Sequence, residues 1–278
     1  MSQTAFTDVR RFASIDSTNR YLLDEARAGA PAGVVAVADH QTAGRGRLGR
    51  HWEAPPGSNL LLSVLLRPEL PVGQRHLATT AVALAALDAI EVPGVADAVG
   101  SVSVAAAVGV GINATAVGIK WPNDLVAADG RKVAGVLAEA DLASATPGSP
   151  APVVVGIGIN VNWPATEEDL PIELRGAAVS LRQLRGAEVD REALLDALLD
   201  ALGPRAAALS SASGRAQLAG DLRYRCTTVG ETVRVDLPDE SFVGTAASVT
   251  DDGHLVVDVN GTLRTVVAGD VVHLRPGA

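Results

Sequence analysis

Apolar and polar positions along the 278-residue chain change their period several times, and each period predicts a different element. Residues 17–30 carry apolar side chains at helical spacing, with polar residues suited to capping at the start and a glycine near the end, so they predict a helix. Residues 34–41 and 60–66 are short apolar runs, which are typical of buried strands. Residues 76–90 are rich in Ala and Leu and predict a second helix.

The middle of the chain adds further strands to this prediction. Residues 118–127 and 132–140 are apolar runs on either side of Asp129-Gly130, a dipeptide typical of hairpin turns. They therefore predict two strands joined by a tight turn. Residues 153–163 form another apolar run and predict a further strand, so the core is expected to be a sheet with helices.

The segment that follows is predicted to be helical. Residues 194–209 are amphipathic and predict a helix that is interrupted at Gly203-Pro204, because proline lacks the backbone N–H that a helix interior needs. Residues 217–224 predict another short helix. These helices would complete the part of the chain that contains the sheet.

The last fifty residues have a different pattern of apolar and turn-forming residues. From residue 228 onwards, short apolar runs are separated by turns of Gly, Asp and Asn, which predicts a small all-β barrel. We place the domain boundary near Cys226. The chain is thus expected to contain a larger domain over residues 1–225 and a smaller one over residues 226–278.

A segment rich in Gly, Ala and Val at residues 94–118 has no clear period, and we expect it to be a strand or a loose hairpin. Residues 98–119 lack charges over a length that could span a bilayer. The stretch contains no Leu or Phe and several Ser, Asn and Thr residues, which makes membrane insertion weakly favourable. No membrane span is therefore expected.

The composition restricts the possible functions. The chain has 23 Lys and Arg residues against 32 Asp and Glu residues, a formal net charge of -9, which opposes binding to nucleic acid. A single cysteine, Cys226, excludes an intrachain disulfide framework. The first residues lack the apolar run of a secretory signal, so a cytoplasmic protein is expected.

Two stretches carry candidate chemistry. Residues 44–50 read GRGRLGR, and three arginines on a glycine-rich loop could clamp one anion, although the glycine spacing fits neither a dinucleotide fingerprint nor a P-loop. Residues 120–124 read KWPND and residues 131–135 read RKVAG, and the predicted hairpin brings them together. Lysine, asparagine and carboxylate side chains in one place suit chemistry on a nucleotide.

With two further stretches, these motifs resemble those of the biotin protein ligase family, and they occur in the family's order. The matching stretches are DSTN at 16–19, QTAGRGR at 41–47, KWPND at 120–124, RKVAG at 131–135 and GIGIN at 156–160. A similar GVGIN at 109–113 lies in the Gly/Ala-rich segment, and we prefer the later copy because it follows a predicted buried strand.

The resemblance implies an α+β fold with a mixed β-sheet and flanking helices, like that of lipoate ligases and class II synthetases, plus a small C-terminal SH3-like barrel. It implies ATP-dependent activation of biotin as biotinyl-5'-AMP and transfer of biotin to a lysine of a biotin carboxyl carrier protein. The first motif begins at Asp16, so we expect a form without an N-terminal DNA-binding domain, with no DNA partner. A monomer or weak homodimer is expected.

The resemblance also implies roles for individual residues. The implied biotin-binding residues are Ser17, Thr18, Asn19, Gln41, Arg45, Gly46, Arg47, Lys132, Gly135, Gly156 and Gly158, with apolar contacts from Leu137 and Ile159. The implied nucleotide-binding residues are Arg45, Arg47, Arg50, Trp52, Asn123, Asp124 and Asn160. The implied catalytic residues are Lys132, Arg47 and Asp124, while Mg²⁺ is expected to arrive with ATP rather than on a protein metal site.

Two alternatives stay open from the sequence. A lipoate or octanoyl ligase of the same superfamily would share the lysine and the sheet but would need a narrow apolar tunnel, whereas Ser17, Thr18 and Gln41 favour a ureido group. A non-enzymatic RNA-binding module would use the arginine loop as its footprint. Aromatic residues make up only 3% of the chain, which leaves few stacking platforms for such a module.

Overall fold

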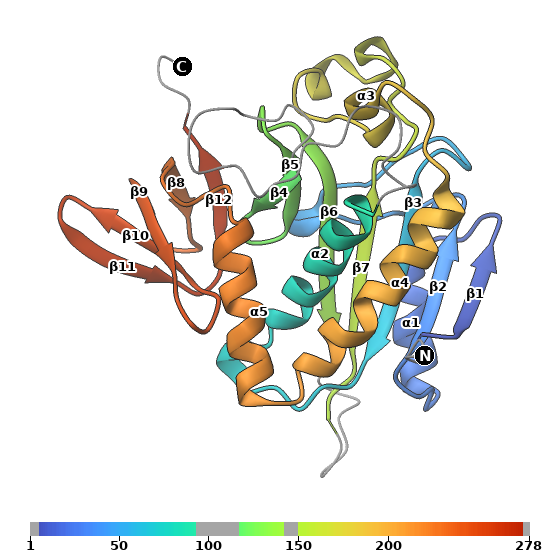
Figure 1. The fold of residues 1–278 in the computed structure, drawn as a ribbon, viewed down its shortest axis with the longest axis horizontal. Helices are drawn as coiled ribbons and strands as arrows, with labels where there is room; N and C mark the ends of the chain where they lie inside the picture. The colour runs from blue at the N-terminus through green and yellow to red at the C-terminus, as the bar shows by residue number, and fades with distance from the viewer. Residues whose placement is uncertain (1–5, 93–116, 142–149, 275–278) are drawn as a thin grey trace.

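The computed structural model describes residues 6–92, 117–141 and 150–274 (Figure 1). These residues form a seven-stranded sheet with helices on its faces, and a five-stranded antiparallel sheet made by the last part of the chain. The fold class predicted from the sequence is confirmed.

The large sheet is mixed. Its strands are β1 (Asp8–Phe12), β2 (Val34–Ala38), β3 (Leu60–Leu66), β4 (Val117–Lys120), β5 (Asp124–Ala127), β6 (Lys132–Ala140) and β7 (Val153–Ile159). They lie in the order β1-β2-β3-β7-β6-β5-β4, and only the pair β1 and β2 is parallel. The sequence did not predict β1, because this edge strand, DVRRF, is mostly polar.

Helices cover both faces of this sheet (Figure 1). The helix α1 (Thr18–Arg27) packs Leu22 against β2, β3 and β7 on one face. The helix α2 (Leu77–Ile90) packs against the other face, and α4 (Arg191–Ala208) and α5 (Ala212–Arg225) pack on α2. Neighbours on all sides bury nearly every side chain of α2, which explains why it is rich in Ala and Leu.

The small sheet follows α5. Its strands are β8 (Thr232–Asp236), β9 (Ser241–Val249), β10 (Leu255–Val259), β11 (Thr262–Val266) and β12 (Asp270–His273), in the order β11-β10-β9-β8-β12. Its buried residues join the same apolar cluster as α2. The buried Trp121 donates a hydrogen bond from Nε1 to the carbonyl oxygen of Gly253 at 3.1 Å, which ties the two sheets together. The division into residues 1–225 and 226–278 therefore stays a prediction.

One predicted strand is wrong. Residues 118–127 are not a single strand, because residues 121–123 form a turn that separates β4 from β5. The turn contains Pro122, which has no backbone N–H for a ladder hydrogen bond. As a result, the KWPND motif lies at the end of the hairpin of β4 and β5, where Lys120 lies opposite Asp124.

Two helix predictions also need correction. The helix α4 continues through Pro204 without the predicted interruption. One helical hydrogen bond is lost there, but α4 buries Leu198 and Leu202 along α2, and this packing stabilises the continuous helix. The helix α5 begins at Ala212, five residues earlier than predicted, because Ser211 caps it by accepting a hydrogen bond from the Gly214 amide.

The strand or hairpin predicted for residues 94–118 lies mostly outside the described residues, as does the GVGIN copy at 109–113. Within the part of the chain that the structure describes, no helix combines the length and apolar character needed to cross a membrane.

Candidate active site

The floor of the site is a set of small residues on the face of the large sheet that α1 only partly covers. In the strand register, Ser63 of β3 lies opposite Gly156 of β7, which lies opposite Leu137 of β6. In the next row, Gly158 lies opposite Gly135. Directly opposed residues of antiparallel strands share a face, so these residues form one continuous hollow beside the N-terminus of α1.

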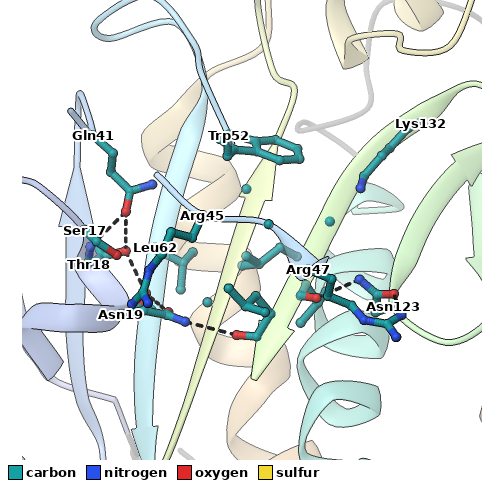
Figure 2. Close-up of a pocket in the computed structure, with 18 residues that line it drawn as sticks. Ser17, Thr18, Asn19, Gln41, Arg45, Arg47, Trp52, Leu62, Asn123 and Lys132 are labelled. Carbon is teal, nitrogen blue, oxygen red and sulfur yellow. Dashed lines mark hydrogen bonds between the residues drawn. The ribbon is translucent and has the colours of Figure 1, made fainter. Parts of the chain in front are cut away.

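The polar end of the hollow is built by the start of α1 and the segment after β2 (Figure 2). Ser17, Thr18 and Asn19 are buried there. Gln41 Oε1 accepts hydrogen bonds from the Thr18 backbone amide at 2.8 Å and from the Thr18 hydroxyl at 3.1 Å. Ser17 also caps α1 by accepting from the Arg20 amide, so helix capping and pocket lining coincide at this residue.

The arginine loop, residues 44–50, covers the hollow. Its three arginines have separate partners and do not converge on one point. Arg45 pairs with Glu139 at 3.2 Å, and Arg50 pairs with Asp270 at 2.9 Å. Arg47 donates to Asn123 Oδ1 at 2.7 Å and to the Gly269 carbonyl at 2.9 Å. The single-anion clamp predicted from the sequence is therefore not the arrangement in this structure.

The KWPND and RKVAG motifs meet as the hairpin predicted. Lys132 Nζ lies 2.8 Å from Asp124 Oδ1, and Asn123 Nδ2 lies 3.2 Å from the same oxygen. The buried Asn160 donates to the carbonyl oxygens of Lys132 and Val179, so its amide group supports the backbone that carries Lys132. A cation and a side-chain amide are thereby each fixed within hydrogen-bonding distance of one carboxylate oxygen.

Trp52 lies between the polar end of the hollow and Lys132 (Figure 2). A side chain on Gly158 would come within 2.5 Å of the indole ring, and one on Gly135 would lie 3.2 Å from it, so both glycines make room for Trp52. The Lys132 ammonium lies 5.5 Å from the ring centroid. The indole Nε1 is buried without a hydrogen-bond partner among the described residues. A buried donor without a partner costs free energy, so this position of the ring is not stabilised by a hydrogen bond at Nε1.

Trp52 separates two compartments. All eleven predicted biotin-binding residues line the first, together with Leu62, Ser63, Trp52, Asn123, Val136, Leu137 and Ile157. The second is lined by six of the seven predicted nucleotide-binding residues, namely Arg47, Arg50, Trp52, Asn123, Asp124 and Asn160. Arg45 lines only the first of these two compartments.

Some lining residues were missed by the sequence analysis. Ser63 could have been found, because it is the one polar residue in an apolar strand. The sequence analysis also missed Trp163, Leu170 and Leu174 on the second compartment, which follow β7 in a segment of loops and short 3-10 helices with no motif. The predicted apolar contact from Ile159 is wrong, because its side chain is fully buried in the core and lines neither compartment.

Two half-buried bases lie beside the second compartment. Burial lowers the pKa of Lys120, although the negative charges of Asp124 and Asp270 act in the opposite direction. Burial and the nearby Lys120 lower the pKa of His273 to about 4. His273 Nε2 lies 3.0 Å from the Thr228 hydroxyl, which accepts a hydrogen bond from the Trp121 amide at 2.9 Å. No group of three potential metal ligands occurs among residues 6–92, 117–141 and 150–274.

Comparison with known proteins identifies the family. Residues 11–160 match the model of the biotin/lipoate A/B protein ligase family, and residues 228–274 match that of the biotin protein ligase C-terminal domain. The chain is 40% identical over 266 residues to a biotin--[acetyl-CoA-carboxylase] ligase from Mycobacterium tuberculosis, covering 95% of this chain and 88% of the relative. The chain belongs to the biotin protein ligase family.

Other relatives support the same family assignment. This chain is 29% identical to a bifunctional ligase/repressor BirA from Bacillus subtilis, with 92% of this chain and 71% of the relative covered. A biotin protein ligase from Aquifex aeolicus, solved with biotin and ATP, superposes with a TM-score of 0.75 at 24% identity, covering 97% of this chain and 100% of that chain. At that identity, the superposition establishes the shared fold of the ligase.

Proposed function

We propose that this ligase activates biotin with ATP to form biotinyl-5'-AMP and pyrophosphate, and then transfers biotin to a lysine of a biotin carboxyl carrier domain. The observation that carries the proposal is the meeting of two compartments at Lys132 and Arg47. Both residues line both compartments, so they can act where an acid group from one meets a phosphate from the other.

Biotin is assigned to the first compartment. A ureido group has two N–H donors and one carbonyl acceptor, and it cannot be buried without partners. Thr18 and Gln41 are fixed by their mutual hydrogen bonds, and they, with Ser17 and Asn19, offer both donors and acceptors. Gly135, Gly156 and Gly158 keep the floor low, and Arg45 and Gly46 belong to the loop above it. The flat bicyclic ring of biotin would then lie on this floor, with Trp52 displaced from it towards the second compartment.

The nucleotide is assigned to the second compartment. Trp52 offers an aromatic face for adenine, and Arg47 and Arg50 offer charge for phosphates, while Asn123, Asp124 and Asn160 line the wall. Arg45 would add charge from the side of the biotin compartment. Two of the carboxylates that line this compartment, Asp124 and Asp270, are already paired with Lys132 and Arg50, which fits Mg²⁺ arriving on the ATP phosphates.

The proposed chemistry has two steps. First, a carboxylate oxygen of biotin attacks the α-phosphorus of ATP, and pyrophosphate leaves. Lys132 and Arg47 neutralise the charge that develops on the transferred oxygens. Second, the carrier lysine amine attacks the activated carbonyl carbon, the carbon–oxygen bond to AMP breaks, and the amine loses a proton. Asp124, held 2.8 Å from Lys132, would orient that amine.

The wider assignments rest on the family and on composition. The relative from M. tuberculosis is a biotin--[acetyl-CoA-carboxylase] ligase, which supports the carrier domain of a biotin-dependent carboxylase as the acceptor. The single cysteine and the use of ATP fit a cytoplasmic protein. A monomer or weak homodimer, with a ligase domain at residues 1–225 and a small domain at 226–278, completes the proposal.

A direct test measures pyrophosphate release from ATP with biotin or lipoate as the acid. Release that requires biotin, followed by labelling of a carrier domain, is the expected result. Release with lipoate and not with biotin would instead support the lipoate ligase alternative. Steeply salt-dependent RNA binding with no pyrophosphate release would support the RNA-binding alternative.

A further inference from the structure

We propose that Glu139 is a positioning residue that sets the hydrogen-bond polarity of the biotin compartment through Asn19 and Ser63. This inference rests on the proposed function, because it concerns how the ureido group of biotin is received. Glu139 itself does not line the biotin compartment. Its role is therefore to orient residues that do.

Glu139 lies at the end of the floor. On β6 it is two residues from Leu137, on the same face, and it lies opposite Val154 of β7. Its carboxylate accepts a hydrogen bond from Asn19 Nδ2 at 2.7 Å, and it pairs with Arg45 at 3.2 Å. One carboxylate thus binds the start of α1 and the arginine loop at once.

The carboxylate fixes the direction of the Asn19 amide. Asn19 Nδ2 lies near two groups that can only accept, the Glu139 carboxylate and the Leu137 carbonyl at 3.2 Å. The opposite orientation would bring Asn19 Oδ1 against these oxygens. The Oδ1 atom therefore points the other way, into the space that the absent side chain of Gly156 leaves open.

Asn19 in turn directs the Ser63 hydroxyl. Asn19 Oδ1 lies 2.6 Å from Ser63 Oγ and cannot donate, so the single hydrogen of Ser63 goes to Asn19. Ser63 Oγ also lies 2.7 Å from Thr18 Oγ1. The hydrogen of the Thr18 hydroxyl goes to Gln41 Oε1 at 3.1 Å, so Thr18 Oγ1 can only accept from Ser63, and Asn19 Oδ1 draws the single Ser63 hydrogen away from it.

The direction of the Ser63 hydrogen bond determines what Thr18 can offer to biotin, because Thr18 lines the biotin compartment. Its hydroxyl donates its only hydrogen to another group of the protein. The lone pairs of the oxygen therefore remain available to accept a hydrogen bond from an N–H of the ureido group. With Asn19 turned around, Ser63 would donate to Thr18 and use one of those lone pairs. Gln41 needs no such control, because the Thr18 backbone amide already holds its Oε1 and leaves Nε2 as a donor.

The test compares two substitutions of Glu139. Glu139→Leu removes the acceptor for Asn19, whereas Glu139→Gln retains an oxygen that can accept from Asn19. Both variants lose the charge that pairs with Arg45, so that loss cancels in the comparison. Calorimetry of the full chain gives the Kd for biotin alone. We expect Glu139→Leu to raise this Kd about tenfold or more and Glu139→Gln to change it by about threefold or less.

A double-mutant cycle with Ser63→Ala tests the route. If Glu139 acts through Ser63, the Kd of the double variant Glu139→Leu/Ser63→Ala for biotin equals that of the single variant that binds biotin less tightly. Thermal unfolding of each variant checks that the fold is retained, and the KM for ATP should stay within about threefold of wild type, because the network ends at the biotin compartment.

Three results separate the possible failures. Equal effects of Glu139→Leu and Glu139→Gln would overturn the proposal and assign the effect to the pairing with Arg45. Effects of Glu139→Leu and Ser63→Ala that multiply would also overturn it. Wild-type protein that binds no biotin would overturn the proposed function itself, and with it this inference.

Discussion

Arg47 of the arginine loop donates a hydrogen bond to the backbone carbonyl of Gly269, 2.9 Å away in the turn before β12. The small C-terminal sheet thus holds a residue that lines both compartments of the site. Arg50 adds an ion pair to Asp270, the first residue of β12. Exposed ion pairs contribute about 1 kcal/mol or less, so these contacts position the loop more than they stabilise the fold.

The contact with Gly269 leads to a prediction for Arg47→Ala. The loop loses its hydrogen bonds to Asn123 and Gly269, so it should close less firmly over the adenylate. We expect biotinyl-5'-AMP to escape and label surface lysines of bystander proteins, as detected by mass spectrometry. Hydrogen exchange of residues 44–50 should become slower in wild type when biotin and ATP bind. No labelling by the variant, with equal exchange in both states, would contradict this account of the loop.

Lys132→Ala should nearly abolish adenylate formation. Removing one preorganised charge from the reacting oxygens typically costs about a hundredfold in rate. The measurement is biotin-dependent pyrophosphate exchange, with circular dichroism to verify folding. Lys120→Met is the matched control, since Lys120 lies on β4, two strands away from β6, and lines neither compartment. Activity of Lys132→Ala within a few-fold of wild type would remove Lys132 from the mechanism.

Trp52 should report on biotin binding. The indole covers Gly135 and Gly158, so a ligand that reaches this floor has to displace it. We expect the tryptophan fluorescence of the protein to change when biotin is added. Trp52→Phe should remove that change and leave the steady emission of Trp121 and Trp163. A biotin-induced signal of unchanged size in Trp52→Phe would show that the ring does not move.

Gly156→Ala should weaken biotin binding and lower stability. A Cβ at this position would overlap Asn19 Oδ1 and lie 3.1 Å from Ser63 Oγ, so the polar network would have to shift. Overpacking of this kind typically costs about 1–3 kcal/mol of unfolding free energy. Urea denaturation and biotin calorimetry measure the two effects.

The control for that substitution is Gly220→Ala in α5, where a Cβ meets nothing within 4 Å. Alanine is favoured over glycine in a helix by about 1 kcal/mol, so this variant should be neutral or more stable. Equal behaviour of the two alanine variants would contradict the crowding argued for Gly156.

His273 should contribute to acid sensitivity. Burial lowers its pKa to about 4 from an ordinary value of 6.5, so the unfolded chain takes up this proton first as the pH falls. The stability that depends on neutral His273 is therefore complete above pH 6.5 and is lost as the pH falls towards 4. His273→Gln cannot titrate, and its unfolding free energy in urea should fall less steeply across this window. Parallel pH profiles of variant and wild type would contradict the assignment.

The sequence by itself determined the elements whose signals are local. Continuous apolar runs at residues 34–38 and 60–66 became buried strands because both faces of the sheet are covered by the fold. All eleven residues that the motifs predict to bind biotin line the first compartment, and three of them, Gly46, Arg47 and Lys132, also line the second. Within each motif the prediction succeeds because residues close in sequence stay close in space, whereas the sheet brings the separate motifs together.

The tertiary structure alone decided how those residues are used. It paired Glu139 with Asn19, 120 residues away, and Arg47 with Gly269, 222 residues away. It also laid Trp52 over Gly158, and it kept α4 continuous through Pro204 by packing it against α2. These contacts depend on strand register and on the burial of distant apolar surfaces. A one-residue shift in register would turn each side chain to the other face, and no local pattern in the sequence encodes that choice.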